Sequence, residues 1–129
     1  MADPQLPARR IFIVDDTPAT SYLLGKLLEA MGQSVRCFSD GESALAAASA
    51  EPPNLVISDL SMPGMNGFEL ARQLRERAEL AGTALAALSG LSQESDRELA
   101  RQSGFDHYLV KPVSMDSLRQ LLASLAEPL

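Results

Sequence analysis

The chain has 129 residues, of which 46% are hydrophobic and 22% charged, which fits one globular domain with a single core. A formal net charge of -6 argues against a nucleic-acid partner, because binding to phosphates needs a clustered basic face. No stretch approaches the roughly 20 apolar residues of a membrane span. The N-terminus also lacks the features of a signal peptide. The single cysteine, Cys37, excludes an internal disulfide and suits a reducing cytosol, so we expect a cytoplasmic protein.

A loose lead-in is expected over residues 1–9, followed by one domain over residues 10–126. Apolar runs of strand length alternate along this domain with helical patterns. Five such runs occur, and they are Ile11–Val14, Val35–Phe38, Leu55–Ser58, Ala84–Leu88 and His107–Val110.

The first two helices are predicted from caps and spacing. Thr17 is placed to cap the first helix, with Pro18 at its first position. Apolar residues then recur at steps of three and four, and they are Leu23, Leu24, Leu27, Leu28 and Met31. Ser39 and Glu42 stand three residues apart, a capping-box pattern that predicts a second helix over residues 43–50.

Three more helices follow the later runs. The third contains an apolar face made of Phe68, Leu70, Ala71, Leu74 and Ala78. The fourth, over about residues 92–103, has few apolar anchors, chiefly Leu99 and Ala100, so we expect it to be loosely held. Ser114 is placed to cap the last helix, whose apolar stripe is Leu118, Leu121, Leu122 and Leu125.

Five strands that alternate with five helices predict a parallel sheet covered by helices on both faces. The strands lack period-two alternation, as is typical of strands that are buried on both sides. The first strand is not followed by a Gly-x-Gly-x-x-Gly motif, which disfavours a Rossmann order. The predicted fold is therefore α/β, a single doubly wound five-stranded sheet in the flavodoxin-like order 2-1-3-4-5.

Acidic side chains follow two of these runs, and a lysine follows another. Asp15 and Asp16 come directly after the first run, Asp59 closes the third, and Lys111 follows the fifth. In the order 2-1-3-4-5 the first and third strands are neighbours, so the carboxylates meet at the carboxyl edge of the sheet, with Lys111 across a crevice. The sequence therefore predicts that three acids and one base share one pocket.

Such a pocket suits metal-assisted phosphoryl transfer. Three close carboxylates repel one another unless a cation lies between them, and Mg²⁺ commonly combines carboxylates with a phosphate oxygen. Asp15 and Asp16 are placed to hold the ion, and Asp59 to supply one oxygen as a ligand and another as the nucleophile that forms an acyl phosphate. Lys111 adds positive charge for the transferred group.

Residues near this edge also fit a switch. Ser89 follows the fourth run, with Gly90 after it, and its hydroxyl can donate a hydrogen bond to a phosphoryl oxygen. Tyr108 can turn inward when Ser89 moves, which would couple the site to the outer face. Pro112 directly follows Lys111 and can fix the loop through a cis peptide bond.

Each of these residues has an ordinary structural explanation when it is taken alone. An Asp pair before a helix complements the helix dipole, a lone Asp after a strand is commonly a turn residue, and tyrosines are often half-buried for packing. Their conjunction at four strand ends favours the phosphoryl site. The loop over residues 62–67 is interpreted as structural, a turn into the third helix.

Together these residues resemble the receiver domain of two-component response regulators, over about residues 10–125. The resemblance is carried by the pair Asp15-Asp16, the phosphoacceptor Asp59, the Met-Pro-Gly-x-x-Gly loop from Met62, the hydroxyl of Ser89, the aromatic Tyr108 and the pair Lys111-Pro112. Serine at position 89, where many members have threonine, is a minor departure.

The resemblance implies Mg²⁺-dependent phosphoryl transfer from a phosphohistidine to Asp59. It implies Asp16 as a direct metal ligand, Asp15 as a nearer or water-mediated one, and the backbone carbonyl of Ser61 as the group that completes the metal site. The implied partners are a histidine kinase or histidine phosphotransfer protein, and a downstream protein that binds the face of the fourth helix, fifth strand and fifth helix. Ser61 and Leu91 occupy variable family positions and are candidates for setting the lifetime of the phosphoryl group.

The predicted function is thus a phosphorylation-dependent signalling switch, and not an enzyme. Two alternatives stay open: an unphosphorylated interaction module of the same fold, and a small aspartyl-phosphate hydrolase. Against the hydrolase, no general acid–base stands two residues after Asp59, where Ser61 lies. The sequence leaves open whether the domain is a stand-alone regulator or the receiver of a hybrid sensor kinase.

Overall fold

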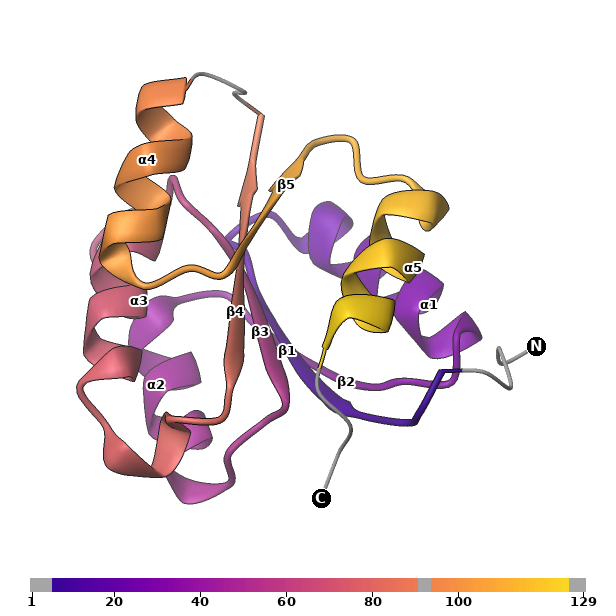
Figure 1. Cartoon of the computed structure of the whole chain (residues 1–129), viewed down its shortest axis with the longest axis horizontal. Helices are drawn as coiled ribbons and strands as arrows, with labels where there is room; N and C mark the ends of the chain where they lie inside the picture. Colours follow the sequence, from indigo (N-terminus) through magenta and orange to yellow (C-terminus); the bar gives the residue numbers. More distant parts are fainter. Residues whose placement is uncertain (1–5, 91–93, 126–129) are drawn as a thin grey trace.

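The computed structural model describes residues 6–90 and 94–125 and has a central five-stranded sheet with helices on both sides (Figure 1). The strands are β1 (Arg10–Val14), β2 (Ser34–Phe38), β3 (Leu55–Asp59), β4 (Ala84–Ser89) and β5 (His107–Val110). The helices are α1 (Pro18–Ala30), α2 (Gly41–Ala50), α3 (Gly67–Arg75), the short 3₁₀ helix η1 (Ala78–Leu80), α4 (Glu94–Ser103) and α5 (Met115–Ser124).

The strand order is β2-β1-β3-β4-β5 and every neighbouring pair is parallel, which confirms the predicted flavodoxin-like fold. α1 and α5 cover one face of the sheet, and α2, α3 and α4 cover the other (Figure 1). Each face has its own hydrophobic cluster. β3 is buried at all five positions, as expected for a strand covered on both sides. The winding reverses between β1 and β3, and ligands bind beyond the carboxyl ends of strands at such a point.

α1 begins at Pro18 as predicted, but two details of its prediction are wrong. The side chain of Thr17 makes no capping hydrogen bond; its backbone N–H donates to Asp15 Oδ1 instead. Leu24 is buried, whereas Leu23 is 62% exposed. The predicted apolar stripe is therefore wider than the face that packs on the sheet.

The predicted cap of α2 is wrong and that of α5 is confirmed. Asp40 caps α2, since its carboxylate accepts the N–H of Ser43, so the expected box of Ser39 and Glu42 does not form the cap. Adjacent Ser and Asp residues are almost equal as N-caps, and local spacing alone does not choose between them. In α5 the side chain of Ser114 accepts a backbone N–H three residues further on.

The third helix is shorter than predicted. α3 ends at Arg75, and Ala78 lies in the separate turn η1. The Arg75 guanidinium donates to the carbonyls of Thr83 at 2.8 Å and Gly104 at 3.0 Å, and it forms an ion pair with Asp106 at 2.6 Å. These bonds tie the end of α3 to the start of β4 and to the turn after α4.

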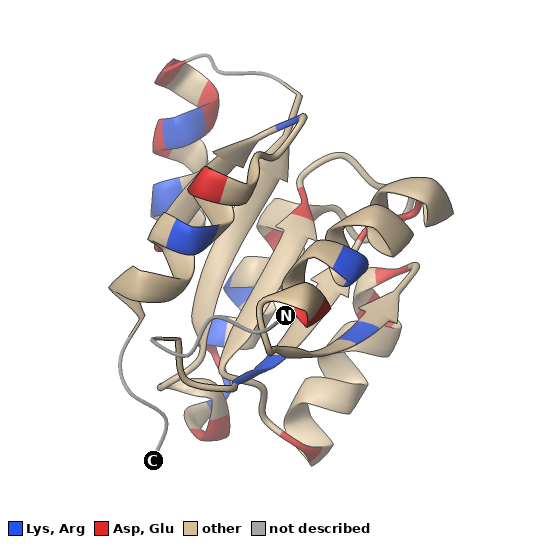
Figure 2. Cartoon of the chain, turned by 90° about the vertical axis from the view of Figure 1, so that its right-hand side faces the viewer, with Lys and Arg blue, Asp and Glu red and all other residues tan. Residues whose placement is uncertain are grey.

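α4 makes few buried contacts, as its sequence predicted. Its buried residues are Ala100 and Ser103, whereas Leu99, expected to anchor it, is 44% exposed. Acidic and basic segments follow one another along this helix (Figure 2). The predicted start of the helix near residue 92 lies outside the described residues.

The last residue of the N-terminal lead-in packs against the domain. Arg9 is buried, and its backbone N–H donates to Gln33 Oε1 at 3.0 Å. Among residues 6–90 and 94–125, none of the helices combines the length and the apolar character needed to traverse a bilayer.

Candidate functional site

The carboxyl ends of β1, β3 and β5 bring acidic and basic side chains to one edge of the sheet. In the register of β1 with β3, the last paired residues directly precede Asp15 and Asp59. In the register of β4 with β5, Ser89 lies opposite the residue that precedes Lys111. Residues far apart in the sequence therefore meet because each ends a strand of the same parallel sheet.

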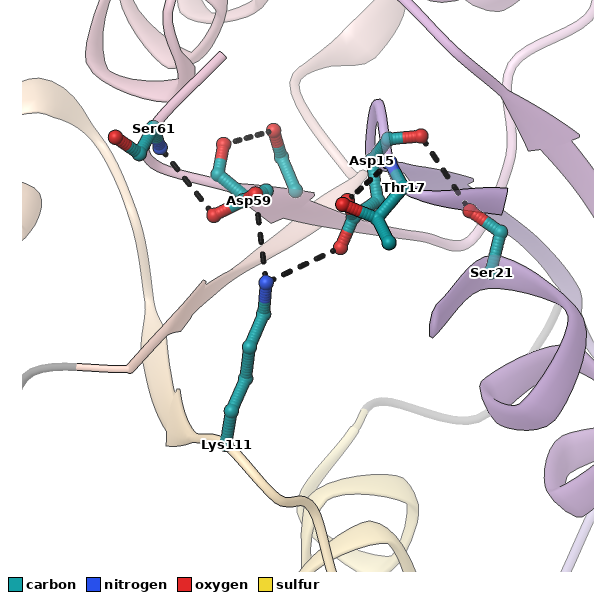
Figure 3. A network of polar contacts seen from close by, with 7 residues as sticks. Asp15, Thr17, Ser21, Asp59, Ser61 and Lys111 are labelled. Carbon is teal, nitrogen blue, oxygen red and sulfur yellow. Dashed lines mark hydrogen bonds and ion pairs between the residues drawn. The ribbon is translucent and has the colours of Figure 1, made fainter. Parts of the chain in front are cut away.

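The side chains at this edge lie within reach of a single ion. One carboxylate oxygen from each of Asp15, Asp16 and Asp59 lies within 4.8 Å of the other two. Lys111 Nζ lies 3.4 Å from Asp15 Oδ2 and 3.4 Å from Asp59 Oδ2 (Figure 3). These distances confirm the predicted meeting of three acids and one base at one edge of the sheet. Three carboxylates and one ammonium leave an excess of negative charge there.

One oxygen of the Asp15 carboxylate accepts a hydrogen bond and the other does not. Its side chain is fully buried, and Oδ1 accepts the backbone N–H of Thr17 at 2.9 Å. Oδ2 accepts no hydrogen bond, and its contact is the ion pair with Lys111. A buried carboxylate oxygen in this state retains lone pairs for a cation. This contact was not predicted, because Thr17 makes it through its backbone N–H and not through its side chain.

Asp59 lies beside Asp15 in a largely buried position. Ser61 donates its backbone N–H to Asp59 Oδ1 at 3.3 Å (Figure 3). Burial raises the pKa of the Asp59 carboxyl above its ordinary value, opposed by the Ser61 N–H and the Lys111 ammonium and reinforced by the Asp15 charge. The ionised carboxylate is thus less stable here than in water, and additional positive charge would favour it.

Ser89 and Tyr108 lie on the neighbouring strands β4 and β5. Ser89 is the buried last residue of β4, and its carbonyl accepts the Lys111 N–H at 2.7 Å. Tyr108 is half-buried, and the Arg97 guanidinium of α4 lies 4.6 Å from its ring centroid. This cation–π contact joins α4 to β5 and was not predicted, because α4 and β5 approach each other only in the folded chain.

The loop after β5 has the expected proline geometry. The peptide bond between Lys111 and Pro112 is cis, as predicted. Leu91, predicted to influence the lifetime of a phosphoryl group, lies outside the described residues.

An apolar groove of about 320 Å³ adjoins the acidic cluster at Lys111. Its lining comes from α1, the end of β4 and the loop after β5, and consists of Thr20, Leu23, Leu24, Leu27, Leu88, Lys111, Pro112 and Val113. The groove was not predicted, because Leu23 and Leu27 were placed in the apolar stripe of the first helix without a partner for its outer edge.

Residues 11–123 match the family model described as the response regulator receiver domain. The chain belongs to this family. Receiver domains act in two-component signalling, so the predicted phosphorylation-dependent switch is confirmed at the level of the family. As a receiver domain the protein is a signalling switch and not a classical enzyme.

The curated relatives of this receiver domain include short regulators and long kinases. PilH of Pseudomonas aeruginosa is 38% identical over 109 residues, which cover 84% of this chain and 90% of PilH. The sensor histidine kinase GacS of Pseudomonas protegens is 39% identical over 118 residues, covering 89% of this chain but only 13% of the kinase. The receiver domain therefore resembles both a protein of its own size and a small part of a much larger one.

Solved receiver structures share the fold. The chemotaxis protein CheY4 of Vibrio cholerae has a TM-score of 0.85 and 26% identity, covering 91% of this chain and 98% of CheY4. The receiver of the sensor kinase PA1611 from Pseudomonas aeruginosa, with a magnesium ion coordinated in its active-site cleft, has a TM-score of 0.82 and 25% identity over 89% and 94% of the chains. The co-crystal structure of the Saccharomyces cerevisiae phosphotransfer protein Ypd1 with the Ssk1 receiver matches with a TM-score of 0.83 and 26% identity over 92% and 88%.

Proposed function

We propose that this receiver domain accepts a phosphoryl group on Asp59 from the phosphohistidine of a histidine kinase or a histidine phosphotransfer protein. The observation that carries the proposal is the cluster of Asp15, Asp16 and Asp59 around Lys111 at one sheet edge. The magnesium site of the PA1611 receiver and the complex of Ypd1 with Ssk1 support the same chemistry and the same class of donor.

The transfer uses Asp59 as the nucleophile. A carboxylate oxygen of Asp59 forms a bond to phosphorus while the phosphorus–nitrogen bond of the phosphohistidine breaks, and the leaving imidazole keeps that electron pair. Lys111 Nζ already lies 3.4 Å from Asp59 Oδ2, so it is placed to pair with an oxygen of the transferred group. Charge on the phosphoryl oxygens is spread in the transition state, so placement and positive charge provide most of the catalysis.

The residues present fit a magnesium ion. Asp15 contributes a buried carboxylate oxygen that accepts no hydrogen bond, and Asp16 and Asp59 supply oxygens within 4.8 Å. Such hard oxygen donors are those Mg²⁺ prefers. We assign Asp15, Asp16 and Asp59, with the Ser61 backbone carbonyl, as the groups that would hold the ion. When bound, the ion neutralises these carboxylates and the oxygens of the phosphoryl group.

Mg²⁺ is expected to stabilise the fold, because it relieves the repulsion among the three carboxylates. At a concentration one hundred times the dissociation constant, the gain is about 2.7 kcal/mol. Denaturant unfolding with increasing Mg²⁺ measures this gain. The Asp16→Asn variant should lose most of it, whereas Glu79→Gln, at an exposed acid outside the cluster, should keep it. Equal stabilisation of both variants would place the ion elsewhere.

The groove beside Lys111 supports a protein as the donor. Leu23, at its rim, is 62% exposed, and Lys111 is the charged residue in its lining. A protein that delivers a phosphoryl group to Asp59 has to cover the surroundings of Lys111, and an apolar helix face of that protein would bury this groove.

Replacement of Leu23 by serine is expected to slow transfer from a phosphorylated donor protein about tenfold relative to transfer from acetyl phosphate, since a buried interface anchor is worth more than about 1 kcal/mol. The two rates, measured by phosphoprotein gel or intact mass, give this ratio. Leu99→Ser is the matched control, because Leu99 is also exposed but lies on α4. A ratio unchanged by Leu23→Ser would remove the groove from the donor interface.

The output is proposed to be an altered surface of α4, β5 and α5. When Asp59 carries the phosphoryl group, Ser89 and Lys111 move toward it and Tyr108 follows. The contact of Arg97 with the Tyr108 ring would then be lost, which frees a helix whose buried residues are Ala100 and Ser103. A downstream protein would recognise this changed face.

Incubation with acetyl phosphate and Mg²⁺, followed by intact mass, tests the function. A single phosphoryl adduct on the protein supports the switch. Continuous turnover of a small phosphate ester would favour the hydrolase, and the absence of any adduct would favour the unphosphorylated interaction module.

A further inference from the structure

The loop from Met62 to Gly67 carries more than a change of chain direction. Met62 is 8% exposed, and Gly64 has a positive φ of 75°, a conformation that favours glycine. The side chain of Asn66 caps α3 by accepting the N–H of Glu69 at 2.9 Å. These features account for the turn itself, but they leave Gly67 unexplained.

Gly67 lies directly against the backbone of the phosphoacceptor. Its N–H donates to the Leu60 carbonyl at 3.1 Å. A Cβ added at Gly67 would lie 2.3 Å from the carbonyl oxygen of Asp59 and 2.8 Å from Leu60 Cα. Both are main-chain atoms, so they cannot swing aside as the end of a flexible side chain can. A side chain at this position therefore requires the Asp59–Leu60 backbone to move.

Backbone conformation does not explain the glycine at this position. Gly67 is the first residue of α3, and the glycines with positive φ are Gly32, Gly64 and Gly104. Glycine is also a poorer helix former than alanine. Close approach of α3 to β3 is the physical reason for glycine here.

The loop is also held from its other side. A Cβ at Gly41, the first residue of α2, would lie 2.9 Å from the Met65 sulfur, so Met65 packs closely against the start of α2. The start of α3 consequently has little room to retreat from β3, and strain introduced at Gly67 is transmitted to Asp59 and the residues after it.

We propose that Gly67 is a positioning residue for phosphoryl transfer. By letting α3 close onto the backbone of Asp59 and Leu60, it sets where the Asp59 carboxylate and the Ser61 main chain lie relative to Asp15. The Ser61 N–H holds Asp59 Oδ1 at 3.3 Å, so a shift of this three-residue segment moves the nucleophile and its hydrogen-bond donor together. This inference rests on the proposed phosphoryl transfer.

Gly67→Ala is expected to slow phosphorylation by acetyl phosphate about tenfold to a hundredfold per folded molecule, the range for a small misplacement of a reacting group. In the metal-free protein the NMR amide resonance of Ser61 should also move. Gly82→Ala is the matched control, because a Cβ at Gly82 meets nothing within 4 Å. It should leave both readouts at the wild-type value.

A second control separates positioning from loss of stability. Ile11→Val removes a methylene group from a buried residue of β1, which should lower the unfolding midpoint and leave the rate unchanged. If Gly67→Ala changes only the unfolding midpoint, as Ile11→Val does, Gly67 is structural and the proposal is wrong.

Asn66→Ala provides a test that adds no bulk, in case Gly67→Ala does not fold. It removes the cap of α3 and loosens the start of the helix. A slower rate together with a moved Ser61 resonance would support the proposal, and the wild-type rate and resonance would overturn it. A wild-type protein that takes no phosphoryl group would refute the proposed function instead, while the Ser61 resonance still reports whether Gly67 positions the segment.

Discussion

The Asp59→Asn variant is expected to take no phosphoryl group from acetyl phosphate or from a phosphorylated donor protein. The amide lacks the anionic oxygen that attacks phosphorus. Asp15 and Asp16 belong to the same cluster, but they are proposed as metal ligands and not as acceptors. Intact mass of the two proteins after equal incubation with Mg²⁺ gives the result. If the variant carries as much adduct as the wild type, a residue other than Asp59 accepts the phosphoryl group.

The same variant is expected to be more stable than the wild type near neutral pH without metal. Burial raises the pKa of the Asp59 carboxyl, so the folded protein holds that proton more tightly than the unfolded chain does. Ionisation therefore lowers stability as the pH rises from the unfolded to the folded pKa, and the full loss persists above the folded value. Asparagine avoids this loss.

The gain in unfolding free energy should be about 1 kcal/mol at about pH 7, within the range of single substitutions, and should vanish towards about pH 3, where the wild-type carboxyl is protonated. Urea unfolding of both proteins across this range measures the difference. A variant that is less stable than the wild type at neutral pH would show that the hydrogen bond with Ser61 and the ion pair with Lys111 outweigh burial.

Lys111→Met is expected to slow phosphorylation about one hundredfold to one thousandfold, which is the effect of removing one preorganised donor from a charged transition state. The methionine keeps the apolar stem, so the loss reports the ammonium group. Because Lys111 Nζ lies 3.4 Å from both Asp15 and Asp59, the metal-free variant should also lose about 1 kcal/mol of stability. This figure allows for the partial solvent exposure of the lysine.

Lys26 is the matched control, since the chain has two lysines and Lys26 is exposed on α1 beside Glu29. Lys26→Met should retain the wild-type rate with acetyl phosphate. Stopped reactions analysed by intact mass give both rates. If Lys111→Met and Lys26→Met react equally fast, the ammonium at position 111 has no part in the transfer.

Much of this site was predictable because its residues sit at the ends of strands. Apolar runs alternating with helical patterns predict a doubly wound parallel sheet. Once the order is chosen, the residues that follow neighbouring strands have to meet at the carboxyl edge. The strand order alone therefore predicted that Asp15, Asp59 and Lys111 lie together.

The N-cap residues of the first two helices were predicted poorly, because neighbouring candidates have nearly equal capping energies. Thr17 binds Asp15 through its backbone and does not cap α1 with its side chain. Asp40 caps α2 although Ser39 stood at the expected spacing. N-cap alternatives of this kind differ by tenths of a kilocalorie per mole, and contacts elsewhere in the fold readily decide between them.

The order of polar and apolar residues along the chain by itself determined the fold class, the identity of the acidic cluster and the chemistry that suits it. Only the tertiary structure decided which leucines of α1 border a groove, that Arg97 lies over the Tyr108 ring, and that Gly67 touches the backbone of Asp59. The reason is physical. Periodicity and strand ends follow from backbone geometry common to all chains, whereas close approach between elements depends on how particular side chains pack across the core.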